Sequence, residues 1–291
     1  MDTHRVAVAG GVRLALDTWP GDGPGLLLVH GLASNARLWD GVAAHLAGLG
    51  HAVAAVDQRG HGRSDKPDGG YDFATVCDDL VAVVAALAAG LGGDGIPWTR
   101  PVVVGQSWGA NVVIELAFRE PALTRGVGCV DGGTSDLASR FDTWEACAAA
   151  LAPPPIAGTP AAELEAMIRR SHPDWPEAGL AGTMANFEVR ADGTAAPWLS
   201  REHHMAILRS MYEQRPSTRF PAISVPVLFL PADNGDRART AAKREGVDQA
   251  LAAIPEAAAH WFAPADHDVH AQFPAEVAGV LHRAVTDGFW A

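Results

Sequence analysis

The chain is poor in lysine, and acidic residues outnumber basic ones. Only Lys66 and Lys243 are lysines among 22 basic residues, and we interpret this imbalance as compositional bias. Against them stand 34 acidic residues, so the formal net charge is −12. A protein with this charge repels the phosphate backbone of a nucleic acid, so we do not expect a nucleic acid as its partner.

Cysteines and long apolar runs are also scarce. Cys77, Cys129 and Cys147 are odd in number and widely spaced, which argues against a disulfide framework or a zinc site. The longest apolar stretch, residues 80–91, has about two-thirds of the length that a membrane-spanning helix needs. The first residues lack the basic-then-apolar layout of a secretory signal. We therefore expect a cytoplasmic protein without a membrane partner.

One glycine-rich segment imitates a cofactor motif. Residues 90–95 match G-x-G-x-x-G, but they follow a predicted helix, whereas a dinucleotide site needs a strand before the glycines. No G-x-x-x-x-G-K-[ST] phosphate loop occurs. The sequence therefore predicts no cofactor and no bound metal.

What the sequence does contain is an alternation of strands and helices. Two short runs around Gly10-Gly11, residues 4–9 and 12–19, predict an antiparallel hairpin. Apolar runs that are typical of strands buried on both faces then alternate with helical patterns, which predicts a parallel sheet covered on both sides. The expected strands are 26–29, 52–56, 102–104, 126–130, 225–230 and 258–262; the expected helices are 37–49, 73–91, 108–119, 239–253 and 275–286.

The alternation stops between residues 135 and 219. This stretch has helix-like patterns at 141–151, 161–170 and 201–214 and no convincing buried strand. We expect a helical cap at 135–219, inserted between core segments 1–134 and 220–291. Four of the five methionines and three of the nine tryptophans lie in it. They form either the core of the cap or an apolar pocket; the candidates for substrate contact are Trp144, Trp175, Met184 and Trp198.

A candidate nucleophile lies where an expected strand meets a helix. Residues 105–109 read Gly-Gln-Ser-Trp-Gly, the pattern G-x-S-x-G. A sharp strand-to-helix turn needs neighbours without Cβ atoms so that the serine hydroxyl becomes exposed. The following helix points its positive end at developing negative charge. We therefore predict that Ser107 is a nucleophile.

A serine nucleophile needs a general base, usually histidine. His267 lies in a loop between the last expected strand and helix, which opens at the same sheet edge as Ser107. His270 is the rival, with packing against the last helix as its other role. Neither this pair nor His203-His204 has the spacing of a helical metal site.

Backbone amides beside the serine complete the expected chemistry. Residues 27–32 form a buried strand that ends in His30-Gly31-Leu32. This turn places the Leu32 N–H near the Trp108 N–H, and two such donors form an oxyanion hole. We expect His30 itself to hold the loop by hydrogen bonds.

Together these segments resemble the α/β-hydrolase superfamily. The matching pieces are HGLAS at 30–34, DQRGHGRSD at 57–65, GQSWGA at 105–110 and ADHDVH at 265–270. The resemblance implies an eight-stranded, mostly parallel sheet with a helical lid inserted after strand six. It also implies a Ser–His–acid triad, and a structural role for the 57–65 loop.

The acid of the implied triad has more than one candidate. The family usually supplies it after strand seven, where Asp233 and Asp236 fit only with a shift in register. Some members supply it after strand six, where Asp131 lies. We place Asp131 slightly ahead of Asp236.

These residues predict hydrolysis of carboxylic esters or lactones through an acyl-enzyme on Ser107, with a small, apolar molecule as substrate in a pocket closed by the lid. The same triad also serves C–C bond hydrolases and proline-releasing aminopeptidases, which bind the substrate amine through lid carboxylates. A receptor-like relative with little turnover is the alternative of another class. The lid carboxylates that the aminopeptidase alternative would use are Glu188, Glu202 and Glu213. The sequence does not predict an oligomeric state.

Overall fold

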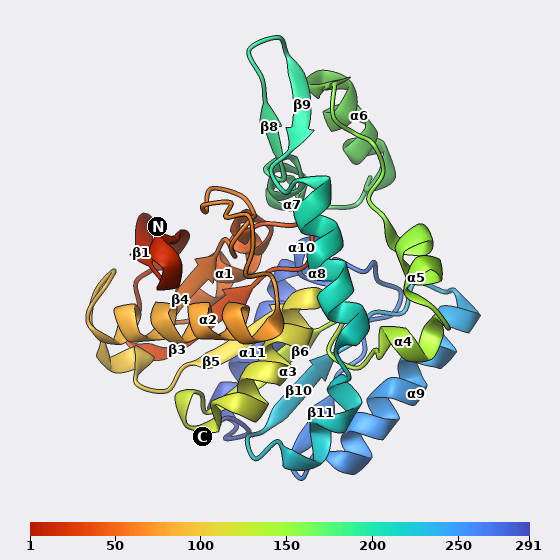
Figure 1. The fold of residues 1–291 in the computed structure, drawn as a ribbon. Helices are drawn as coiled ribbons and strands as arrows, with labels where there is room; N and C mark the ends of the chain where they lie inside the picture. Colours follow the sequence, from red (N-terminus) through yellow and green to blue (C-terminus); the bar gives the residue numbers. More distant parts are fainter.

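The computed structural model describes residues 1–291 and contains one large sheet of eight strands. The strand order is β1-β2-β4-β3-β5-β6-β10-β11 (Figure 1). β2 pairs antiparallel with β1 and β4, and all the other pairs are parallel. The strands are β1 (Asp2–Ala7), β2 (Arg13–Trp19), β3 (Gly23–Val29), β4 (His51–Val56), β5 (Val102–Gln106), β6 (Gly126–Val130), β10 (Val227–Leu230) and β11 (Ala257–Ala259).

The sheet is buried on both faces, which explains the continuous apolar runs of its central strands. Along β3, Leu27 and Val29 belong to one core cluster, whereas Leu26 and Leu28 belong to the other. Successive side chains of a strand point to opposite faces, so each cluster receives every second residue. Helices α2 (Phe73–Ala88), α3 (Trp108–Arg119) and α9 (Arg237–Ala253) contribute to the first cluster, and α1 (Asp40–Gly48) and α11 (Pro274–Thr286) to the second.

The expected alternation of the core is confirmed, with small differences at element ends. The region expected as one helix at 37–49 begins with a 3₁₀ turn, Ala36–Trp39, before α1. The side chain of Asn35 accepts a hydrogen bond from the Arg37 N–H and starts this turn. The last expected strand, 258–262, is shorter, because β11 ends at Ala259 and only Phe262 forms a further bridge to Ala232.

The chain between β6 and β10 is not wholly helical, which corrects the expected helical cap. It also contains a three-stranded sheet of order β7-β9-β8, whose β8–β9 hairpin projects away from the main sheet (Figure 1). These strands are two to four residues long, and only Ala195 and Ala196 in them are buried, so no apolar alternation revealed them. The elements are α4 (Leu137–Arg140), α5 (Trp144–Leu151), β7 (Thr159–Pro160), α6 (Ala161–Ser171), α7 (Glu177–Met184), β8 (Phe187–Val189), β9 (Thr194–Pro197) and α8 (Arg201–Glu213).

This insertion contacts two loops at the carboxyl edge of the main sheet. The Asn35 side chain, in the loop after β3, donates to the backbone oxygen of Gly182 on α7 at 2.8 Å. Trp175 Nε1 donates to Asp266 Oδ2 at 3.0 Å in the loop after β11. The insertion therefore braces the two loops that carry Leu32 and His267. None of the helices, in the insertion or the core, has both the length and the apolar character needed to span a membrane.

Candidate active site

Ser107 lies in a tight turn between β5 and α3, as the motif predicts. Its backbone has φ 53° and ψ −117°, a strained conformation for a residue with a side chain. A Cβ on Gly109 would lie 2.5 Å from the Val29 oxygen and 2.6 Å from the His30 oxygen. A Cβ on Gly105 would overlap the backbone of Gly109. The two glycines therefore allow the close approach that holds Ser107 at the sheet edge, where the residue is partly exposed.

We expect Gly109→Ala to lower both stability and any hydrolytic activity. The added methyl group forces the end of β3 away from α3, and such overpacking costs about 1–3 kcal/mol of unfolding free energy. Displacement of the N–H groups around Ser107 lowers turnover by about 10²-fold or more. Urea unfolding and ester hydrolysis measure the two effects.

Gly48→Ala is the matched control, because a Cβ at Gly48 has no atom within 4 Å. It lies in α1, where alanine is favoured over glycine by up to about 1 kcal/mol. The control is expected to keep wild-type activity and to be at least as stable. Equal behaviour of the two variants would contradict the tight packing of the turn.

The loop after β3 presents the Leu32 N–H beside the serine. A Cβ on Gly31 would lie 3.1 Å from the Ser107 Cβ, so the two segments are in contact. The Leu32 N–H forms no hydrogen bond in the protein. Trp108 is the first residue of α3, and the first N–H of a helix has no acceptor within the helix. Both predicted oxyanion donors are thus available to a ligand.

His30 anchors this loop, as expected. Its Nδ1 donates to the Gly31 oxygen at 2.7 Å, and its Nε2 accepts from the Gln58 N–H at 3.0 Å. Complete burial lowers the pKa of His30 to about 4, so the ring is neutral. The 57–65 loop is also structural, since Arg59 forms a buried, two-bonded ion pair with Asp79.

The structure brings His267 and Asp131 together. His267 Nδ1 lies 2.7 Å from Asp131 Oδ2, and the carboxylate comes from the residue directly after β6. Burial raises the pKa of Asp131, but the hydrogen bond and charge of His267 and the charge of Lys243 outweigh burial and hold the pKa below its ordinary value. Desolvation opposes the charge on His267, but the Asp131 hydrogen bond and the charge of Asp268 raise its pKa. The pair can accept a proton at Nε2 and stabilise the resulting imidazolium.

The other two acid candidates lie elsewhere. Asp236 is exposed, and its side chain accepts from the Ala238 and Arg239 N–H groups, which makes it the N-cap of α9. Asp233 accepts from the Gly235 N–H and the Thr240 hydroxyl. Neither forms a hydrogen bond with His267. In the loop after β10, Asp236 thus caps α9, and Asp233 holds the turn that precedes it.

His270, the rival base, lies in the core. It is fully buried, its ring packs at a tilt of 47° against that of Trp39 with the ring centres 4.2 Å apart, and neither ring nitrogen has a hydrogen-bond partner. Burial lowers the pKa of His270 to about 3. His270 therefore lacks a carboxylate partner such as Asp131 provides for His267.

Two residues beside the site were not recognised from the sequence. Gln106 donates through Nε2 to the His267 oxygen at 3.3 Å and to Asp268 Oδ1 at 3.1 Å, which ties the His267 loop to β5. Lys243 Nζ lies 2.5 Å from Asp131 Oδ1. Gln106 stands inside the G-x-S-x-G motif, whereas the only sequence signal for Lys243 was the rarity of lysine.

The four aromatic and methionine candidates in the insertion do not form one group. Trp175 is buried against Leu38 and Leu180, and Trp144 packs on Arg209 and Tyr212. Lys66 Nζ lies 5.0 Å from the ring centre of Trp198. Met184, the last residue of α7, is half-buried. Trp175 and Trp144 therefore serve the packing of the insertion.

The insertion does not enclose the candidate site in this structure. Of the His267 side chain, 56% is exposed, and Ser107 is partly exposed. The expected closure by the lid is therefore not observed. Among the lid carboxylates, Glu213 pairs with Arg209 at 2.6 Å, whereas Glu188 and Glu202 are exposed without such a partner.

Sequence comparison finds hydrolases that match part of the chain. A 2-(acetamidomethylene)succinate hydrolase of Mesorhizobium japonicum is 35% identical over 111 residues, which are 38% of this chain and 36% of that protein. An esterase of Mycobacterium tuberculosis is 35% identical over 120 residues (41% and 36%), and epoxide hydrolase B of that organism is 33% identical over 129 residues (43% and 34%). The chain spans about a third of the length of these curated relatives.

Solved structures share the whole fold. A crystal structure of E-2-(acetamidomethylene)succinate hydrolase has a TM-score of 0.76 at 23% identity and covers 99% of both chains. An enzyme described as degrading N-acyl homoserine lactones has a TM-score of 0.70 at 23% identity, over 96% of this chain and 99% of that one. At this identity the likeness shows the fold. The model described as the alpha/beta hydrolase family matches residues 26–280, and the chain belongs to this family.

Proposed function

We propose that the protein is a serine hydrolase that cleaves carboxylic esters or lactones of small to medium apolar molecules. The observation that carries the proposal is the constellation at one sheet edge. Ser107 occupies a strained turn, and His267 is paired at 2.7 Å with a buried carboxylate. The Leu32 N–H, in the loop after β3, has no acceptor within the protein, and the Trp108 N–H begins α3. A nucleophile, an oriented base and oxyanion donors are the parts that acyl transfer requires.

The proposed reaction has two halves. The Ser107 Oγ forms a bond to the acyl carbon while its proton passes to His267 Nε2, and the oxyanion is held by the Leu32 and Trp108 N–H groups. The carbonyl then re-forms, the bond to the leaving alcohol breaks, and His267 returns the proton to the alcohol oxygen. Water, deprotonated by His267, then attacks the acyl-enzyme. The bond to Ser107 Oγ breaks, His267 returns the proton to that oxygen, and the acid leaves.

The preference for apolar substrates rests on what surrounds Leu32. Its side chain packs against an apolar cluster of the insertion, so the oxyanion loop borders apolar surface. An ester with small aliphatic groups loses little by leaving water there. The cluster and its partly buried neighbours are Leu137, Cys147, Leu208, Phe141, Trp144, Met205, Met211 and Tyr212.

Other hydrolytic reactions use the same parts and stay as alternatives. The related proteins include hydrolases named for a carbamate and for an acetamidomethylene succinate. C–C bond hydrolysis also fits a serine, a histidine and an oxyanion hole. A proline-type aminopeptidase is less favoured, since Glu213 is already paired with Arg209. A receptor-like protein would keep the fold without turnover.

A substrate panel and an activity-based probe test the proposal. The wild type is expected to hydrolyse p-nitrophenyl acetate and butyrate faster than a matched p-nitroanilide or carbamate, and a fluorophosphonate probe should label it at Ser107. Ser107→Ala is the control and should do neither. Absence of both turnover and labelling in the wild type would refute the enzyme hypothesis; preference for charged or long polymeric esters would refute the substrate class.

A further inference from the structure

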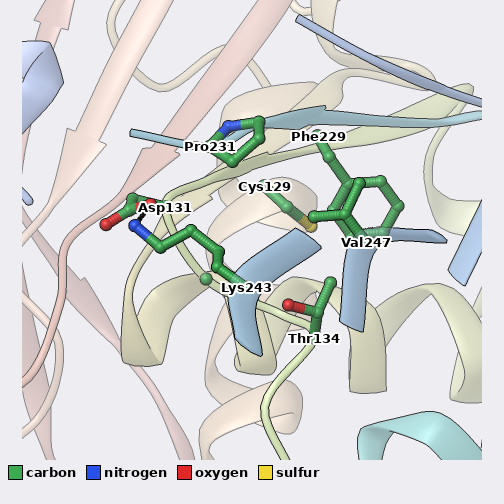
Figure 2. A pocket seen from close by; sticks show the side chains of 8 residues that line it. Cys129, Asp131, Thr134, Phe229, Pro231, Lys243 and Val247 are labelled. Carbon is green, nitrogen blue, oxygen red and sulfur yellow. Dashed lines mark hydrogen bonds and ion pairs between the residues drawn. The ribbon is translucent and has the colours of Figure 1, made fainter. Parts of the chain in front are cut away.

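Lys243 is one of only two lysines in the chain, and it reaches the carboxylate that orients His267. It lies on α9, the helix after β10, and its Nζ donates to Asp131 Oδ1 at 2.5 Å (Figure 2). The same Nζ also donates to the Ala232 backbone oxygen. The Asp131 side chain is 3% exposed and that of Lys243 is 28% exposed. The pair is therefore a largely buried ion pair rather than a surface contact.

The contacts of Asp131 divide between its two oxygens. Oδ1 accepts from the Ala232 N–H at 2.8 Å and from Lys243, whereas Oδ2 accepts from His267 Nδ1. Because the donors on Oδ1 come from the loop after β10 and from α9, the carboxylate cannot rotate without losing them. Oδ2 is thereby left to the imidazole alone.

The surroundings strengthen this ion pair. A cavity of about 10 Å³ adjoins it, too small for more than one water molecule. Its lining includes the apolar side chains of Phe229, Pro231 and Val247 (Figure 2). Charges interact more strongly where water is excluded.

The Asp131 backbone adds a reason for external support. Its φ of 43° lies in the left-handed region, which a residue with a side chain adopts at a cost. In the resemblance described above, the loop after strand seven, which is β10 here, usually supplies the triad acid itself. In this protein that loop and helix α9 instead supply two donors to an acid that follows β6.

We propose that Lys243 is a positioning residue of the hydrolase, which holds the Asp131 carboxylate in place for His267. This rests on the proposed function of the site. The Lys243 charge lies near His267 and disfavours its protonated form, so it lowers the pKa that Asp131 and Asp268 raise. More of the base is then neutral, and able to accept the Ser107 proton, near pH 7.

Several other ionisable groups surround His267, Asp131 and Lys243. Asp268 and the neutral, buried His270 face His267, and Asp266 and His172 lie beyond Asp268. Asp233 and Arg244 lie near Lys243, and Arg244 is 3.8 Å from Asp233. Apart from His267 itself, Lys243 is the charged side chain that donates directly to Asp131. Its removal therefore changes the carboxylate without removing a direct contact of His267.

The test measures the pH dependence of kcat/KM for Lys243→Met, Lys243→Arg and the wild type. Loss of the cation should move the acid limb up by about one pH unit, which means about tenfold lower kcat/KM below the limb. Lys243→Arg keeps the charge and should keep the limb. Arg244→Met, one residue along α9, removes the same charge from a 53% exposed side chain and should leave the profile unchanged.

A second measurement does not depend on turnover. The pKa of His267 can be followed by NMR in histidine-labelled protein, with the signal assigned through His267→Gln, and should rise in Lys243→Met. An unshifted or lowered pKa, with an unshifted limb in an active enzyme, would overturn the role of Lys243. A wild type without turnover or probe labelling would instead overturn the proposed function, and the NMR titration would still judge the Lys243 contact.

Discussion

Asp131→Asn is expected to lower kcat by about 10⁴-fold with little change in KM. The structure gives the reason in atoms. Lys243 and the Ala232 N–H are both donors to Oδ1, so the amide oxygen of an asparagine must take that place. The amide NH₂ then faces His267 Nδ1 and holds the imidazole with its proton on Nε2. Such a tautomer cannot accept the Ser107 proton.

Asp236→Asn and Asp233→Asn are the matched controls, because they make the same chemical change in the two carboxylates that do not touch His267. Asparagine caps a helix about as well as aspartate, so Asp236→Asn should also keep its stability. Steady-state kinetics on p-nitrophenyl butyrate, with circular dichroism to verify folding, measure all three. Wild-type turnover in Asp131→Asn, or a large loss in either control, would assign the acid elsewhere.

Ser107→Ala and His267→Ala are each expected to reduce kcat by at least about 10⁴-fold, and the double variant by no more than either single one. Residues that act as one unit are non-additive, since removal of the base leaves the nucleophile inactive and the reverse also holds. The activity that persists would come from the free N–H groups of Leu32 and Trp108. The kinetics of the wild type, the two single variants and the double variant together form a double-mutant cycle that measures this non-additivity.

His270→Leu is the control for the rival base. Its imidazole forms no hydrogen bond and lies in apolar surroundings, so leucine should fill the space at little cost in unfolding free energy. Turnover should stay within about tenfold of wild type, the expectation for a side chain that packs without taking part in proton transfer. Additive losses in the Ser107 and His267 double variant, or a His270→Leu as inactive as His267→Ala, would contradict the proposed roles.

Much of the core was predictable because its signals are local. The hairpin around Gly10-Gly11 and the strand before Ser107 follow from turn residues and apolar runs, and the structure confirms them. The turn at Ser107 was predictable for the same reason, since Gly105 and Gly109 in the motif indicate that backbone segments approach each other closely there. The three-stranded sheet of the insertion was not predictable, because strands of two to four residues are too short to show an alternation of apolar and polar residues.

The sequence by itself determined the kind of fold and the chemical parts of the site. The strand, the G-x-S-x-G turn, the helix after it and the loop that carries His267 can each be recognised from a few neighbouring residues. Only the tertiary structure decided which carboxylate meets His267 and which cation meets that carboxylate. Asp131, Lys243 and His267 are brought together by long-range packing of β6, α9 and the loop after β11. The rarity of lysine, which we interpreted as compositional bias, could not predict that Lys243 contacts Asp131. That contact depends on the fold alone.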